Sequence, residues 1–259
     1  MTAYKSRTSD AFTHTDLYNA TGTLNTGGTG GLYGRTEPGA AALGVVYRNV
    51  QNGVQAWIYD FADLADLLFL QGRHDFWRRG LHPFVGAQWV RQTGSGAHYL
   101  GAVAATAYGV LFGIARRAFA FSIRYNDIPS HPGAYGNGGI VSPYTSGYAT
   151  DPLYTTTMSQ SLVGNEAPGH AFAIRFRGFF RHHTMRVAMG YARYYSALNH
   201  LSIVPHSSAV DFDATYFFGG PLAGLSLRDR VAIIRSPVVS DHLVYNRLML
   251  QYRFGMGIS

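Results

Sequence analysis

Arginine is the residue type in this sequence best suited to binding a charged solute. The chain has 21 basic residues among 259, and all of them except Lys5 are arginine. A guanidinium group stays charged at any working pH and offers a planar pair of N–H groups to a carboxylate. Several arginines alternate with apolar residues in short segments: Arg124, Arg175, Arg177, Arg186, Arg228, Arg230, Arg247 and Arg253. Placed along one wall of a cavity, they would favour an anionic or zwitterionic solute.

Other reactive groups are weaker candidates. The adjacent pair His182-His183 suggests a metal, but neighbouring side chains on a strand point apart and no carboxylate stands at ligand spacing. The absence of cysteine excludes thiolate metal sites and cysteine nucleophiles. No stretch resembles a nucleophile elbow, and the glycines at 27–31 do not follow a strand of a βαβ unit. We therefore expect no enzyme activity, no metal and no cofactor.

The elements that position the arginines are predicted to be strands, because polarity alternates with a period of two. In the clearest segment, 244–254, Leu248 and Leu250 share one face while Arg247 and Arg253 share the other. Similar alternation occurs in 118–126, 172–177, 185–192 and 225–233, and more weakly in 42–49, 54–61, 65–73, 83–92, 98–110 and 209–218. Asp229 is out of pattern, on an apolar face. The sequence predicts about eleven strands of roughly ten residues.

The segment Leu100–Ala115 does not alternate clearly. It is nearly all apolar or small, and Arg116 and Arg117 follow it, as in a transmembrane helix with positive flanking charge. Its length falls short of the roughly 20 residues that a bilayer requires. We expect two strands joined by a tight turn, with a helix as the alternative.

The apolar faces fit either the core of a soluble barrel or sandwich, or the lipid-facing side of a membrane barrel. Strands of about ten residues match a tilted bilayer crossing and exceed the five or six usual in soluble sheets. Aromatic residues lie near predicted strand ends, as interfacial girdles require. This set is Trp77, Trp89, Tyr125, Tyr191, Tyr194, Tyr195, Tyr252 and Phe254.

These features favour a membrane barrel. The alternative is a soluble arginine-rich β-barrel or sandwich that binds anionic ligands. A sequence pI near 9.7 would suit nucleic-acid binding, but the arginines are spread over many strands rather than clustered, so no nucleic acid is expected as a partner.

Several stretches resemble OprD-type outer-membrane porins. The most specific runs from Ser142 to Met158 and continues at Gly169-His170-Ala171, and it is similar to the long-loop signature of that family. More diffuse similarity covers Ala42 to Phe254, including Trp57–Phe61 and Gly220–Arg228. The resemblance implies an antiparallel transmembrane β-barrel in the bacterial outer membrane, in contact with lipid and lipopolysaccharide. It also implies passive diffusion of small hydrophilic, carboxylate-bearing solutes, such as amino acids or organic acids, along a basic ladder.

The resemblance also sets expectations about extent. Members of the family have a signal peptide and about 18 strands, whereas this sequence predicts about 11 and shows no apolar stretch after its basic start. We expect an incomplete barrel: a Gly/Thr-rich loop segment at 1–40, then the C-terminal part of a porin barrel at 41–259. A homotrimer would be compatible with a full-length chain.

The predicted loop at 127–168 is long enough to be functional. Tyr144, Asp151 and Tyr154 would provide acidic and hydroxyl groups opposite the arginines if this loop folds inward as a constriction. The alternative is an external lid that does not contact solute.

Overall fold

The computed structural model describes residues 4–5, 12–13, 40–77, 80–141, 153–158, 160–165, 167–181, 184–197, 206–237 and 242–253. Within these residues, no helix is long and apolar enough to cross a membrane. The described helical turns are three short 3-10 elements: η1 (Tyr135–Asn137), η2 (Val163–Asn165) and η3 (Gly220–Leu222).

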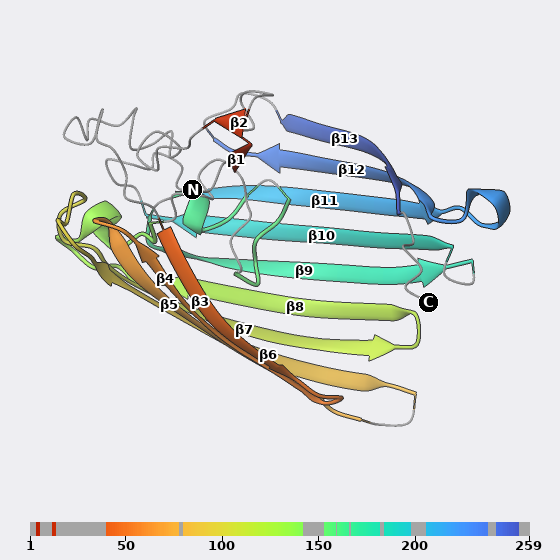
Figure 1. Cartoon of the computed structure of the whole chain (residues 1–259), viewed down its shortest axis with the longest axis horizontal. Coiled ribbons are helices and arrows are strands. Elements are labelled where there is room, and N and C mark those ends of the chain that lie inside the picture. Colours follow the sequence, from red (N-terminus) through yellow and green to blue (C-terminus); the bar gives the residue numbers. More distant parts are fainter. Residues whose placement is uncertain are drawn as a thin grey trace.

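Eleven strands form one antiparallel sheet in which each strand pairs with its neighbours in sequence. They are β3 (Ala40–Arg48), β4 (Asn52–Phe61), β5 (Ala65–Asp75), β6 (His82–Gly94), β7 (Ala104–Arg116), β8 (Phe119–Ile128), β9 (Gly169–Phe180), β10 (Met185–Ser196), β11 (His206–Phe217), β12 (Leu225–Arg235) and β13 (Leu243–Tyr252). The short strands β1 (Tyr4–Lys5) and β2 (Phe12–Thr13) pair with each other. Figure 1 shows the eleven strands following one another around a strongly curved, open sheet.

The predicted all-β, antiparallel fold of about eleven strands is confirmed. The segment Leu100–Ala115 differs from both expectations, because it is neither a helix nor two strands. Its first residues belong to a turn in which Gly101 has a φ of +74°, and its remainder lies in the single strand β7. The tight turn comes after this strand, where Arg117 has a left-handed φ of 46°.

The connections at the two ends of the sheet differ in length. One end, which we call the short-turn end, holds residues 49–51, 76–81, 117–118, 181–184 and 218–224. At the other, the long-loop end, consecutive strands are joined by the connections that span 62–64, 95–103, 129–168, 197–205 and 236–242. Outer-membrane barrels have the same asymmetry, with short periplasmic turns and longer extracellular loops.

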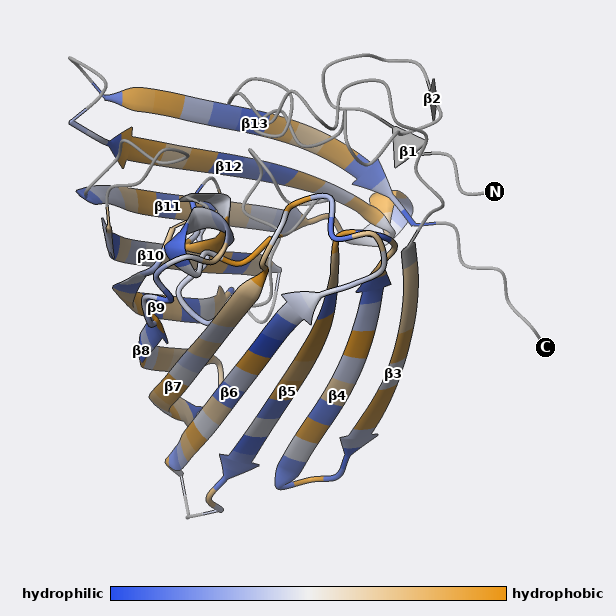
Figure 2. Ribbon diagram, turned by 90° about the vertical axis from the view of Figure 1, so that its left-hand side faces the viewer, coloured by the Kyte–Doolittle hydropathy of each residue, from blue (hydrophilic) through white to orange (hydrophobic). Residues whose placement is uncertain are grey.

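The convex face of the sheet is apolar. Phe121 and Ile123 on β8 are 40% and 53% exposed, and Leu248 and Leu250 on β13 are 66% and 67% exposed. Figure 2 shows bands of alternating hydropathy along the strands. Because successive side chains of a strand point to opposite faces, this alternation gathers the apolar side chains on one face of the sheet. A soluble sandwich would bury such side chains, whereas an exposed apolar surface of this extent suits contact with lipid.

Asp229 lies on this convex face, as the alternation predicts. Its Oδ1 accepts a hydrogen bond of 2.9 Å from Nδ2 of Asn246 on β13. The pair shields one carboxylate oxygen within an otherwise apolar surface, which lowers the cost of its position.

The core lies on the concave face, between the sheet and the connection from β8 to β9. Ile140, Leu153, Leu162 and Val163 of that connection pack onto the sheet in one buried cluster. The sheet residues beneath them are mostly alanines that are at most 2% exposed: Ala105, Ala107, Ala171, Ala173 and Ala192. Small side chains leave the space that the loop occupies, so the sheet packs closely against it.

Candidate functional site

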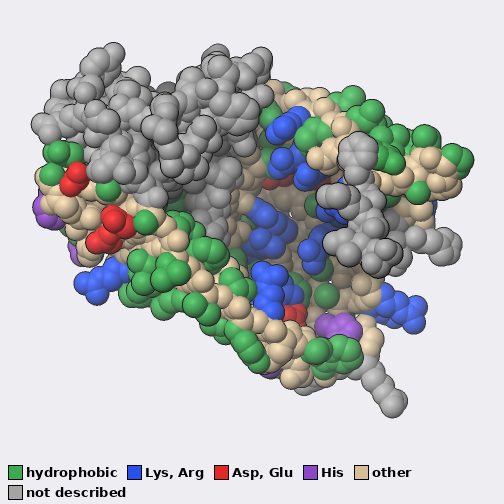
Figure 3. Space-filling model, in the orientation of Figure 1, with side chains coloured by type: hydrophobic (Ala, Val, Ile, Leu, Met, Phe, Trp, Pro, Cys, Tyr) green, Lys and Arg blue, Asp and Glu red, His purple; other side chains and the backbone are tan. Residues whose placement is uncertain are grey.

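Seven of the eight predicted arginines lie in strands on the concave face, as the cross-strand register shows. Arg124 on β8 is opposite the buried Ala173, and Arg175 on β9 is opposite Gly190. The other strand positions on this face are Arg177, Arg186, Arg228, Arg230 and Arg247. Arg253 comes just after the end of β13. Figure 3 shows Lys and Arg side chains gathered inside the hollow of the sheet.

Two arginines on this face were missed by the sequence prediction. Arg48 is the last residue of β3, and Arg73 lies on β5 opposite Gly86. Both lie in segments recognised as weak strands. The alternation is unclear there, because Arg48 shares its face with Val46 and Arg73 shares its face with Phe69.

Acidic residues neutralise part of this basic wall. Asp213 on β11 accepts a hydrogen bond of 2.9 Å from Nε of Arg228 and lies 3.5 Å from Nε of Arg230. On β5, Asp75 accepts two hydrogen bonds from Arg73, of 2.9 Å and 2.6 Å. These arginines are held in fixed orientations and retain only part of their attraction for a passing anion.

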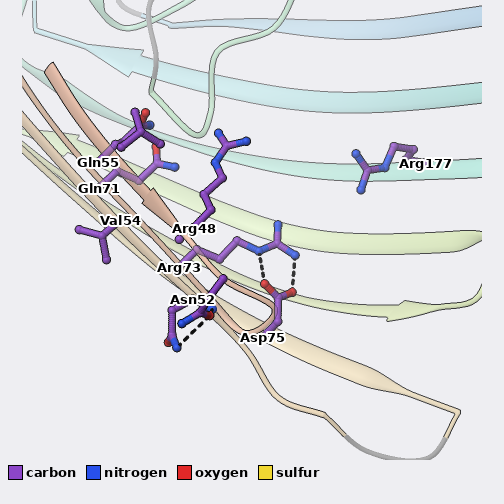
Figure 4. Close-up of a pocket in the computed structure, with 11 residues that line it drawn as sticks. Arg48, Asn52, Val54, Gln55, Gln71, Arg73, Asp75 and Arg177 are labelled. Atoms are coloured by element: carbon purple, nitrogen blue, oxygen red, sulfur yellow. Dashed lines mark hydrogen bonds and ion pairs between the residues drawn. The ribbon is translucent and has the colours of Figure 1, made fainter. Parts of the chain in front are cut away.

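Arg48 and Arg177 differ from the arginines held by Asp75 and Asp213. Among the described residues, no carboxylate forms an ion pair with either of them. They line a cavity of about 490 Å³ with Gln55, Gln71 and Arg73. Figure 4 shows Arg177 coming from β9, across the hollow from the β3–β5 side chains. The cavity therefore offers, from two walls, guanidinium groups that form no ion pair with a carboxylate of the described residues.

The connection between β8 and β9 folds onto the concave face, and Tyr154 anchors it. The Tyr154 backbone N–H donates a hydrogen bond of 3.0 Å to Oε1 of Gln88, and its carbonyl accepts one of 3.2 Å from Arg124. Its hydroxyl lies 3.4 Å from the carbonyl of Gly72 and 3.3 Å from that of Ala87. Burial raises the pKa of Tyr154 to about 12, and the protonated hydroxyl can donate to these carbonyl oxygens.

The next residue of this connection is held in the same way. Oδ1 of the fully buried Asn126 accepts hydrogen bonds from the backbone N–H of Thr155 (3.0 Å) and from its hydroxyl (3.1 Å). The Tyr194 hydroxyl donates to the carbonyl of Thr155 at 2.8 Å. Tyr194 is therefore a buried anchor on the concave face, and its prediction as part of a lipid-facing girdle is wrong.

A third anchor lies near the long-loop end. Gln92 on β6 is 1% exposed, and its side-chain amide pairs with the backbone of Val141. Nε2 donates to the Val141 carbonyl at 2.7 Å, and Oε1 accepts from the Val141 N–H at 2.8 Å. This pairing satisfies both backbone groups of a buried residue, much as a neighbouring strand would.

A carboxylate supports the far side of the loop. Asp211 on β11 accepts a hydrogen bond of 2.9 Å from the backbone N–H of Met158.

Two of the three predicted constriction residues, Tyr144 and Asp151, lie outside the described residues, as does the pair His182-His183. The third, Tyr154, lies inside the hollow rather than outside the sheet.

The packing of Tyr154 predicts an asymmetric response to alanine substitution at two glycines. A Cβ at Gly86 would lie 2.6 Å from the Tyr154 hydroxyl, whereas a Cβ at Gly72 would meet nothing within 4 Å. Gly86→Ala should displace the hydroxyl and lower the free energy of unfolding by about 1–2 kcal/mol, while Gly72→Ala should have little effect. Denaturant unfolding of the two variants measures this difference, and equal losses would contradict the contact.

No family model and no curated protein sequence matches the chain. Solved structures with a similar fold include OccK9 (OpdG) of Pseudomonas aeruginosa, with a TM-score of 0.68 at 21% identity, over 85% of this chain and 55% of that chain. OccK5 (OpdH) of the same organism has a TM-score of 0.69 at 16% identity, over 85% of this chain and 59% of that one. OccAB3 of Acinetobacter baumannii has a TM-score of 0.68 at 18% identity, over 84% and 56%.

These likenesses show the fold. They confirm the OprD-type porin fold that the sequence resemblance implies. The chain spans 55–59% of the length of these three solved chains.

Proposed function

We propose that this chain forms part of a passive outer-membrane porin that admits small hydrophilic, carboxylate-bearing solutes. One observation supports this most: the sheet has an apolar convex face, and its concave face is lined with arginine and partly filled by an inward loop. In a bilayer, the first face meets lipid and the second lines a water-filled path.

In this proposal, the loop narrows the path and the arginines set its preference. A narrow lumen forces the solute close to the wall, where fewer water molecules screen charge. The guanidinium groups of Arg48 and Arg177 attract a carboxylate, and the arginines held by Asp213 attract it less strongly. Several moderate sites allow a solute to leave as well as enter.

The proposed site of action is the bacterial outer membrane, where the convex face contacts lipid and lipopolysaccharide. The soluble alternative predicts release from cells by salt alone. The membrane proposal predicts that the protein stays with the outer-membrane fraction until detergent is added. Its role is conduction rather than catalysis.

The selectivity can be tested with two arginines on opposite faces. In the assembled channel, Arg177→Gln should lower carboxylate permeability roughly five-fold while leaving neutral sugars of equal size almost unchanged. The matched control is Arg193→Gln, because Arg193 stacks over the Tyr195 ring at 5.1 Å on the convex face. Reversal potentials and liposome swelling measure both fluxes. An equal loss for neutral sugars would mean that Arg177 only shapes the path.

A further inference from the structure

A row of three glutamines crosses β4, β5 and β6 on the concave face. Gln55 is opposite Gln71, and Gln71 is opposite Gln88. Gln55 and Gln71 are half-buried and line the arginine cavity, and Figure 4 shows them next to each other on one wall of the hollow. Gln88 is only 5% exposed and binds the docked loop at Tyr154. The row therefore connects the cavity to the loop.

A backbone group fixes the orientation of the Gln88 amide. The N–H of Tyr154 donates to this amide at 3.0 Å, and a backbone N–H can only donate. The atom of Gln88 that faces Tyr154 must therefore be its oxygen, Oε1, and the NH2 group points the other way. Nδ2 of Asn126 lies 3.4 Å from the same oxygen and agrees with this orientation, because Oδ1 of Asn126 is held by Thr155.

The orientation of Gln88 in turn fixes that of Gln71. Nε2 of Gln88 donates to Oε1 of Gln71 at 2.8 Å. Gln71 must therefore turn its oxygen towards Gln88 and its NH2 group away from it. Among the described residues, none accepts a hydrogen bond from Nε2 of Gln71. The chain of hydrogen bonds that starts at the loop thus ends with a donor in the cavity, and each bond in such a chain polarises the next.

Gln55 is oriented by a different donor. The indole N–H of Trp57 donates to Oε1 of Gln55 at 3.3 Å, and an indole nitrogen cannot accept. The Trp57 ring is itself held in place, because it packs over Gly44 so closely that a Cβ there would overlap it. Gln55 therefore also turns its NH2 group away from its partner, and no described residue accepts from it.

We propose that Gln55 and Gln71 are specificity-determining residues, whose amide N–H groups donate to the oxygen atoms of a solute carboxylate in this cavity. Trp57 and Gln88 are positioning residues, since they hold both amides with nitrogen towards the solute. This assignment rests on the proposed function, which brings a carboxylate here. A guanidinium attracts an anion by its charge, whereas fixed N–H groups also define where the carboxylate oxygens lie. An amide able to turn over would present its oxygen as readily, and that oxygen repels a carboxylate.

The first test measures the binding of succinate to the full chain in detergent by calorimetry. Gln71→Met removes the NH2 group and keeps the length of the side chain, so the dissociation constant should rise roughly five-fold. The matched control is Gln251→Met, on the concave face of β13 and outside the cavity, which should bind succinate as the unmodified chain does. Unchanged binding in Gln71→Met overturns the proposal.

The second test reverses the chain of hydrogen bonds from outside the cavity. In Gln88→Glu, one carboxylate oxygen accepts from Tyr154 and the other faces Gln71, so Gln71 must turn its nitrogen towards position 88 and its oxygen towards the solute. The added charge weakens succinate binding in any background. The reversal should add a further loss of roughly five-fold, and only where residue 71 is glutamine. Equal losses with and without Gln71→Met would mean that position 88 acts by charge alone and would overturn its positioning role.

The third test addresses Gln55 through Trp57→Phe, which keeps an aromatic ring and removes the N–H. The dissociation constant should rise about two-fold, because the Gln55 amide is then able to turn over. Trp89→Phe, on the convex face, is the control and should have no effect. Equal binding in Trp57→Phe and the control overturns the role of Trp57.

Gel migration before and after boiling shows whether each variant is folded, and Gln71→Met and Trp57→Phe decide the proposal if Gln88→Glu is not. Because binding is measured without a bilayer, its outcome is separate from conduction. A chain that shows all three changes in binding but passes no succinate into liposomes would refute the porin function and leave the role of the two amides intact.

Discussion

Replacing Gln92 by leucine is expected to release the inward loop and widen the lumen of the assembled channel. The substitution removes both hydrogen bonds to Val141 and leaves a buried N–H and a buried C=O without partners. Each such group costs about 1–3 kcal/mol, so the docked state loses roughly 2–6 kcal/mol. Because the strands do not depend on this contact, the barrel should persist while single-channel conductance rises several-fold.

The control for this substitution is Gln251→Leu. Gln251 lies on the same face of β13 as Arg247, and its side chain is exposed. Gln251→Leu removes the same kind of side-chain amide at a position away from the loop, so conductance should stay at the level of the unmodified chain. Unchanged conductance in Gln92→Leu would mean that the loop does not limit the path. A similar rise in both variants would mean that the effect is not specific to docking.

The strands could be predicted because the two faces of this sheet differ so strictly in polarity. Segments such as 118–126 alternate large apolar residues with small or charged ones, and they correspond to β8 and its neighbours. The exception is informative. On β7 the concave residues Ala105, Ala107 and Gly109 are apolar or small because the loop packs on them, so polarity stops alternating. The burial of that face, rather than a helix or an extra turn, produced the apolar run.

The docking residues could not be predicted from the same pattern. The side chain of Gln92 pairs with the backbone of a residue 49 positions away. Every residue has these backbone groups, so the sequence does not indicate which one is the partner. Asn126 and Gln88 likewise bind backbone groups of the loop, and nothing in their own segments of the sequence indicates this role. Their polarity on the concave face was visible, but only the path of the chain between β8 and β9 shows what they hold.

The pairing of charges across strands depends on register, which the sequence did not supply. Asp213 is opposite Arg230 on the next strand, and this places it within reach of Arg228 as well. An eight-member ladder was expected to act as free positive charge. The structure instead pairs Arg73 with Asp75 on β5, and Arg228 and Arg230 with Asp213, whereas Arg48 and Arg177 form no ion pair with a carboxylate of the described residues.

Replacing both Arg228 and Arg230 by glutamine should therefore change selectivity more than the loss of Arg48 or Arg177 alone. In the unmodified chain, these two cations and Asp213 form a cluster with a net charge of about +1. The double substitution leaves the Asp213 carboxylate alone, so the cluster becomes about −1. At about 1 kcal/mol for each unit of charge at a narrow wall, carboxylate permeability should fall roughly 30-fold relative to a neutral sugar of the same size. Added salt should reduce this difference, because mobile ions screen exposed charges.

Asp213→Asn provides the opposite change at the same place. It frees both guanidinium groups and should raise carboxylate permeability roughly five-fold. The triple variant with Arg228→Gln, Arg230→Gln and Asp213→Asn removes all three charges. Its carboxylate permeability should lie between that of the double variant and that of Asp213→Asn. Reversal potentials under a gradient of a carboxylate salt order the variants. If the double and the triple variants gave the same selectivity, the Asp213 carboxylate would not face the solute, and the neutralised part of the wall would lie outside the conducting path.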